Sequence, residues 1–225
     1  SFKGITGKFD RASLQRGFQV YKEVCSSCHS MQYLSYRNLG EPGGPEFSEQ
    51  EVKAIAASVE ITDGPDDQGE MFTRPGKPAD KFKNPYPNVK ASIAANGGAY
   101  PPDMSVLVKA RPGGSNYIYS VLVGYEDPPE GVTLDDGVYY NKYMIGNKIK
   151  MSSPLSDDIV EYSDGTQASV DQMAKDVTTF LSWAAEPELE ERHRTGVKVI
   201  IYLILLTTLV YLSMKKIWSR VDTEV

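Results

Sequence analysis

A Cys-x-x-Cys-His segment at residues 25–29 constrains this chain more than any other part of its sequence. Cys25 and Cys28 are the only cysteines, and the only histidine besides His29 is His193. Two thiols separated by two residues can add to the two vinyl groups of a haem, and the adjacent imidazole then lies over the iron. The motif therefore predicts one covalently bound haem c, attached through Cys25 and Cys28 and ligated by His29.

Two other uses of this motif have less support. A structural zinc site needs four ligands, and only three are local, with His193 as the sole remaining histidine. A thioredoxin-like dithiol requires a surrounding parallel sheet, which the sequence pattern lacks. Haem attachment is the interpretation that accounts for all three residues.

An apolar run near the C-terminus indicates a membrane anchor. Between residues 199 and 214 only two threonines and one serine are polar. Extended back to Gly196, the run would span about 28 Å as a helix, close to the thickness of a bilayer core. We predict a transmembrane helix at 196–214 and a cytoplasmic or matrix tail at 215–225. The flanking charges make a buried core helix the weaker alternative.

The basic residues do not orient this helix, because three precede the apolar run and three follow it. The haem motif decides the orientation and predicts an extracytoplasmic haem domain at residues 1–195. That domain is acidic, since 20 basic and 28 acidic residues remain when residues 195–225 are set aside. Such a balance disfavours nucleic acid and favours cationic partners, although acidity also serves solubility alone.

Caps and periodicity predict three main helices. Asp10 caps a helix that leads directly into the motif, and Ser48 begins a second through a capping box. Ser169 and Gln172 form another capping box, and the apolar stripe of that helix continues to Pro187.

The composition of the region between the second and third of these helices predicts loops. Residues 61–168 are rich in glycine and proline, with short helical segments near 90–95 and 117–123 and almost no alternation long enough for a sheet. We predict a mainly α, loop-rich haem domain of the class I cytochrome c type, with a single C-terminal transmembrane helix.

The sixth coordination position of the iron would be filled by His193, by a methionine, or by no residue of the chain. His193 lies in a charged segment beside the span, which indicates a solvated residue. Met214 lies in the span, Met173 on the core stripe of the last helix, and Met31 too close to His29. Met151 occupies the loop region before the last helix of the domain, where small c-type cytochromes usually carry this ligand. Three other methionines, and a gap-filling role for Met151, stay open on this argument.

Ligation by histidine and methionine has a chemical consequence. A neutral thioether favours ferrous iron and raises the reduction potential relative to two imidazoles. With both axial positions filled, oxygen and peroxide are excluded, so the site relays electrons and needs no catalytic acid or nucleophile.

Further segments along nearly the whole chain resemble the cytochrome c1 family. In order, they are residues 17–21, 74–77, 84–88, 101–103, 109–111, 160–166 and 183–187. The resemblance implies a haem subunit of ubiquinol-cytochrome c reductase, the cytochrome bc1 complex. It also implies a role as the electron-transfer subunit of this oxidoreductase, without an independent catalytic site on this chain.

The same resemblance implies partners and site residues. The partners are cytochrome b, the Rieske iron-sulfur protein as electron donor, a cytochrome c as acceptor, and the lipid membrane, within a dimeric multi-subunit complex. Met151 matches the axial methionine of the family. Asn96, Arg111 and Tyr117 match residues at the haem propionates, where an arginine makes charge-assisted hydrogen bonds. Ordinary surface roles stay open for these three residues.

Two rival functions follow from the same motif. One is a stand-alone membrane-anchored cytochrome c that shuttles electrons, and the other is a haem peroxidase, which needs an open coordination position. Residues 41–46 resemble bacterial more than mitochondrial members of the family, which favours the periplasm over the mitochondrial intermembrane space.

Overall fold

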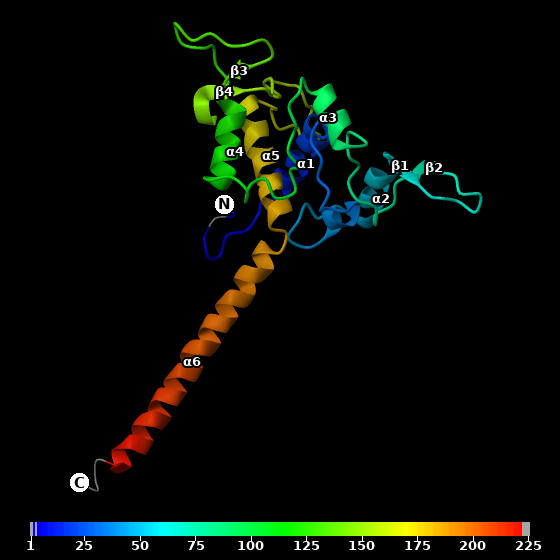
Figure 1. Ribbon diagram of the computed structural model, residues 1–225. Coiled ribbons are helices and arrows are strands. Elements are labelled where there is room, and N and C mark those ends of the chain that lie inside the picture. The colour runs from blue at the N-terminus through cyan, green and yellow to red at the C-terminus, as the bar shows by residue number, and fades with distance from the viewer. Residues whose placement is uncertain (1, 3, 222–225) are drawn as a thin grey trace. The chain divides into compact units, whose positions relative to one another are not determined.

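A computed structural model describes residue 2 and residues 4–221 of the chain (Figure 1). It forms two compact units, residues 9–187 and the segments on either side of them, and each is described by itself. The helices of the first unit are α1 (Arg11–Glu23), α2 (Glu49–Ala57), α3 (Val89–Ala95), α4 (Gly114–Val123) and α5 (Val170–Ala185).

Three short 3₁₀ helices and two small hairpins complete this unit. The 3₁₀ helices are η1 (Cys25–Ser27), η2 (Tyr36–Gly40) and η3 (Ile145–Asn147). Antiparallel pairs join β1 (Glu60–Asp63) to β2 (Phe72–Pro75) and β3 (Tyr139–Tyr140) to β4 (Lys148–Ile149). The prediction of a mainly helical, loop-rich domain is confirmed, whereas the hairpins were not predicted because their strands are too short to show a period.

The three predicted main helices are present. Asp10 accepts a hydrogen bond from the backbone N–H of Ser13 at the start of α1, and Ser48 and Glu51 form a complete capping box at α2. At α5 the capping box is only half formed. Ser169 accepts from the backbone N–H of Gln172, but the Gln172 side chain donates to Asp176 instead of returning to Ser169.

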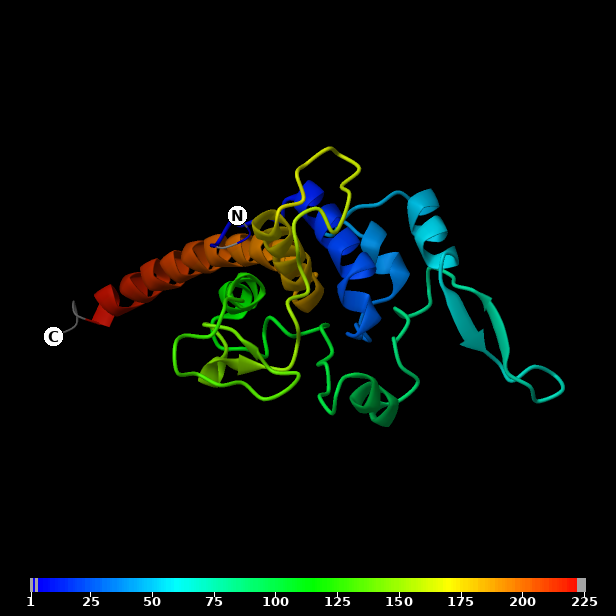
Figure 2. The same cartoon turned by 90° about the horizontal axis from the view of Figure 1, so that it is seen from above.

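Helices α1 and α5 lie side by side, as the two perpendicular views agree (Figures 1 and 2). Gly17 allows this approach, because a Cβ atom there would lie 2.1 Å from the backbone oxygen of Asp176. Phe18 packs beside it, with its ring 5.7 Å from those of Phe47 and Phe180. The crossing therefore forms the centre of an aromatic core.

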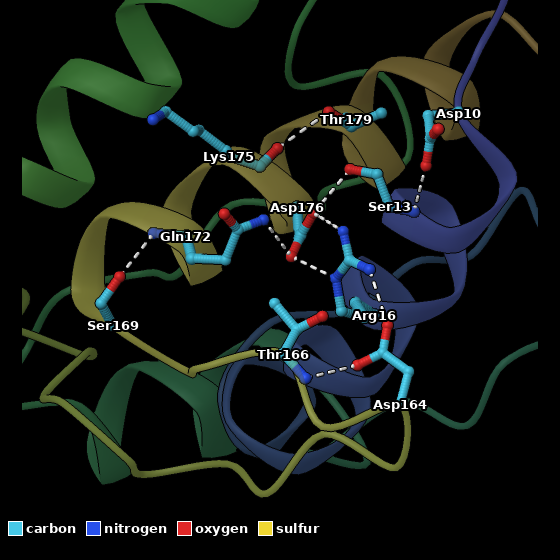
Figure 3. Close-up of polar contacts among 10 residues, drawn as sticks. All are labelled: Asp10, Ser13, Arg16, Asp164, Thr166, Ser169, Gln172, Lys175, Asp176 and Thr179. Carbon is cyan, nitrogen blue, oxygen red and sulfur yellow. Dashed lines mark hydrogen bonds and ion pairs between the residues drawn. The ribbon is translucent and has the colours of Figure 1, made fainter.

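A buried carboxylate joins the same two helices (Figure 3). The Asp176 side chain accepts hydrogen bonds from Ser13 Oγ at 2.6 Å and from Arg16 Nε at 2.8 Å. Gln172 also donates to it, and Arg16 makes a second ion pair with Asp164. Because Asp176 is fully buried, these donors replace the water that it loses on folding.

Helix α6 (Leu189–Val221) belongs to the other unit and contains the predicted span. It is long and apolar enough to cross a membrane, and the large apolar side chains from Val197 to Trp218 are exposed. The helix begins before residue 196 and continues beyond 214, so residues 215–221 of the predicted tail are helical. Residues 222–225 of that tail lie outside the described residues.

Replacing Gly17 by alanine tests the close crossing. We expect Gly17→Ala to destabilise the domain by about 1–3 kcal/mol, because the added methyl group meets backbone that cannot rotate away. Thermal unfolding of the full chain in detergent, followed by circular dichroism, measures the change. Gly196→Ala is the control, since no heavy atom lies within 4 Å of the Cβ that it adds to α6. Equal unfolding midpoints for the two variants would contradict the prediction.

Candidate functional site

The Cys25–His29 segment folds as one compact turn at the end of α1. The helix ends at Glu23, and η1 follows with only Val24 between them. The carbonyl of Cys25 accepts hydrogen bonds from the backbone N–H groups of Cys28, at 3.2 Å, and of His29, at 2.9 Å. Helix α1 therefore determines where both thiols and the imidazole lie.

The two thiols have different surroundings. Cys25 is buried, and burial raises the pKa of its thiol to about 12, with a smaller contribution from neighbouring Cys28. Cys28 is partly exposed and borders a hollow of about 230 Å³ that also reaches Ser92 of α3 and Pro101. Neither thiol forms a disulfide.

His29 is held as a neutral imidazole with a defined tautomer. Burial lowers its pKa and outweighs the hydrogen bond to Pro102, which acts in the opposite direction. Nδ1 lies 2.8 Å from the carbonyl oxygen of Pro102. That oxygen can only accept, so Nδ1 carries the proton and Nε2 keeps its lone pair. An imidazole in this state is suited to ligate a metal through Nε2.

Met151 lies in a segment that two other parts of the chain secure. The hydroxyl group of Tyr125 donates to the carbonyl oxygen of Met151 at 3.1 Å. The ammonium group of Lys150 donates to the carbonyl oxygen of Gly97 at 3.3 Å, just beyond the end of α3. These bonds fix the backbone at Met151 and bring its segment beside Asn96.

The three residues matched to the propionates occupy separate places. Asn96 caps the C-terminus of α3, and its side chain donates to the carbonyl of Ser92 at 2.7 Å. Arg111 is exposed in the turn before α4, and its guanidinium donates to the carbonyl of Ala110. Tyr117 lies on α4 with its hydroxyl 3.2 Å from the sulfur of Met144. Their grouping around one cofactor stays a prediction.

His193 and a zinc centre receive no support as parts of the site. His193 lies on α6, with Nδ1 3.3 Å from the carbonyl oxygen of Gly7 in the same unit. Among residue 2 and residues 4–221, no three His, Cys, Asp or Glu side chains group in a way that could hold a metal ion.

Sequence reasoning missed three residues that support the predicted ligands. Pro102 accepts from His29, Tyr125 donates to Met151, and Asp103 accepts from Ser30 beside His29. Pro102 and Asp103 lie in a segment that carries the family resemblance, and that segment was their only signal in the sequence.

The chain matches the model of the Cytochrome C1 family over residues 1–221. The chain belongs to the cytochrome c1 family. It is 49% identical to a cytochrome c1 of Rhodospirillum rubrum, over 98% of this chain and 86% of that protein. It is also 51% identical to the mitochondrial cytochrome b-c1 complex catalytic subunit of Candida albicans, over 96% of this chain and 73% of that protein.

A third relative is a longer protein. The chain is 50% identical to a cytochrome b/c1 of Bradyrhizobium diazoefficiens over 97% of its own residues, but it spans only 35% of that protein. The resemblance inferred from the motifs is therefore confirmed, and the predicted electron-transfer role fits the family.

The surroundings of the two thiols predict unequal reactivity in the haem-free chain. In haem-free chain at pH 8, we expect iodoacetamide to modify Cys28 at least about tenfold faster than Cys25, because Cys25 is buried and its pKa is raised. Mass spectrometry of tryptic peptides measures both rates. Faster modification of Cys25 would show that the described turn is wrong.

Proposed function

We propose that this chain is the haem c-carrying electron-transfer subunit of a ubiquinol-cytochrome c oxidoreductase, the cytochrome bc1 complex. The observation that carries the proposal is the neutral imidazole of His29, which follows two free thiols in one turn and keeps Nε2 available. The family and the relatives' names support the assembly, since one relative is a subunit of the b-c1 complex and another is a cytochrome b/c1.

The donor set of this turn fits a covalently bound haem c. Cys25 and Cys28 would hold the haem through two thioether bonds, each made by adding a thiol S–H across a vinyl group, an addition that needs no oxidant. His29 would hold the iron through a ring nitrogen and Met151 through its thioether sulfur. Asn96, Arg111 and Tyr117 would contact the propionates, where the positive charge of Arg111 stabilises a carboxylate. When bound, the haem supplies a one-electron ferric/ferrous couple.

The described contacts of the chain hold these ligands in place and limit what the site can do. The carbonyl of Pro102 keeps the proton of His29 on Nδ1, and Tyr125 holds the backbone of Met151. With His29 and Met151 both holding the iron, no coordination position would remain for a substrate, and the chain would transfer electrons without a catalytic acid or nucleophile of its own. A peroxidase would need one of these positions open.

The proposed electron route enters from the Rieske iron-sulfur protein and leaves to a cytochrome c, within a dimeric complex that includes cytochrome b. Helix α6 would anchor the chain in the inner (cytoplasmic or mitochondrial) membrane through residues 196–214. The haem domain, residues 1–195, would then lie in the periplasm or the mitochondrial intermembrane space, with residues 215–225 on the other side. The length and apolar composition of α6 support this arrangement.

Replacing Met151 tests the axial ligand. Mature Met151→Leu should keep its thioether-linked haem but lose the near-infrared absorption band of methionine-ligated ferric haem. Its midpoint potential should fall by on the order of 0.1 V, within the roughly 0.8 V range that axial ligands cover. Met173→Leu is the matched control, because it makes the same substitution at a methionine that is fully buried on α5 and is not the predicted ligand. A wild-type spectrum for Met151→Leu would exclude Met151 as an iron ligand. If wild-type protein gave no pyridine haemochrome of the c type, haem c itself would be excluded.

Co-purification tests the assembly. Extraction in mild detergent from the native membrane should recover the chain with a b-type cytochrome and an iron-sulfur protein, in constant proportion through two chromatographic steps. Quinol-dependent reduction of a soluble cytochrome c should follow the same fractions. A stable single-subunit preparation that retains all of the haem c would favour a stand-alone anchored cytochrome.

A further inference from the structure

The carboxylate of Asp103 bridges two segments that are distant in sequence. Its Oδ2 atom accepts from Ser30 Oγ at 2.7 Å and from the backbone N–H of Gln32 at 3.0 Å. Its Oδ1 atom accepts from the backbone N–H of Ser105 at 2.9 Å. One carboxylate therefore holds residues 30–32 against residues 103–105.

Two further hydrogen bonds join residues 30–33 to residues 104–105. The backbone N–H of Met104 donates to the carbonyl of Ser30 at 2.8 Å, and that of Tyr33 donates to Ser105 Oγ at 3.1 Å. Met104 and Ser105 are buried, so these bonds are protected from water. Together with the Asp103 contacts they form a continuous connection between the two segments.

This connection adjoins both ends of the hydrogen bond to His29. The donor, His29, directly precedes Ser30, and the acceptor, Pro102, directly precedes Asp103. If either segment shifted, the 2.8 Å separation between Nδ1 and the Pro102 oxygen would change. The bond to Nδ1 sets the plane of the imidazole ring and strengthens its basicity as a ligand.

Asp103 also places a negative charge close to the site. Burial raises the pKa of its carboxyl group, but the hydrogen bonds from Ser105, Ser30 and Gln32 outweigh burial, so the pKa lies below its usual value. The carboxylate is therefore ionised at neutral pH. Its charge acts on the side of the site that carries His29.

We propose that Asp103 is a positioning residue for the axial histidine, which orients His29 through Pro102 and lowers the reduction potential of the haem. This inference rests on the proposed function, because it requires His29 to ligate haem iron. It adds a residue that is neither a predicted iron ligand nor one of the three residues matched to the propionates.

Both physical effects of Asp103 act in the same direction. A negative charge nearby stabilises ferric relative to ferrous iron, and a strong hydrogen bond at Nδ1 makes the imidazole a better electron donor. Removing the charge and loosening the bond should therefore raise the potential. A purely structural role would leave the potential of correctly matured protein unchanged.

The test compares three variants of the full-length chain in detergent: Asp103→Asn, Ser30→Ala and Asp80→Asn. Ser30→Ala removes one hydrogen bond to Asp103 and keeps the charge. Asp80→Asn is the matched control, because Asp80 is also a partly buried carboxylate that accepts from a backbone N–H, but its partners are Arg74 and Lys77. Each protein is measured by pyridine haemochrome, by potentiometric titration, and by electron paramagnetic resonance of the ferric form.

We expect all four proteins, wild type included, to contain thioether-linked haem. Asp103→Asn should show a higher midpoint potential than wild type and altered g values, which report the orientation of the axial imidazole. Ser30→Ala should show altered g values with a smaller rise in potential, and Asp80→Asn should match wild type in both. These results would support the positioning role.

Other results would overturn it. If Asp103→Asn matches Asp80→Asn in potential and g values, Asp103 does not position His29. If Asp103→Asn fails to mature, Ser30→Ala decides: wild-type g values and potential would overturn the proposal, and altered values would support it. Wild-type protein without thioether-linked haem would instead remove the proposed function, so the two failures are distinguishable.

Discussion

The close crossing of α1 and α5 is the contact on which the rest of the haem domain depends. Gly17 lets the backbones approach, and the aromatic ring of Phe18 fills the space beside them. The buried carboxylate of Asp176 then joins the helices through Arg16. Because η1 follows α1 after a single residue, this crossing also fixes the turn that carries Cys25. Packing at the helices thus determines geometry at the site.

The site itself is built from loops that hydrogen bonds secure. His29 is held through Pro102, and the backbone of Met151 is held through Tyr125. Each of these bonds joins two segments that lie outside the helices. A redox site benefits from such restraint, since ligands that move little between two oxidation states require little reorganisation. Loops can supply this restraint when partly buried groups, such as Asp103, connect them.

The cap of α5 illustrates how tertiary contacts override a local pattern. Ser169 and Gln172 have the spacing of a capping box, and Ser169 accepts the expected hydrogen bond. The Gln172 side chain donates to buried Asp176 instead, where it adds to the donors from Ser13 and Arg16 that offset the water lost by the carboxylate. At α2, where no buried acceptor competes, the predicted box with Glu51 is complete.

The sequence by itself determined the features that depend on neighbouring residues: the Cys25–His29 motif, the main helices, the apolar run of α6, and membership of the cytochrome c1 family. Only the tertiary structure decided the partners of Pro102, Asp103 and Tyr125. The residues of the His29–Pro102 pair are 73 positions apart, and those of the Arg16–Asp176 pair are 160 apart. No local period or spacing encodes such pairs, because they form only when packing brings distant segments together and removes their water.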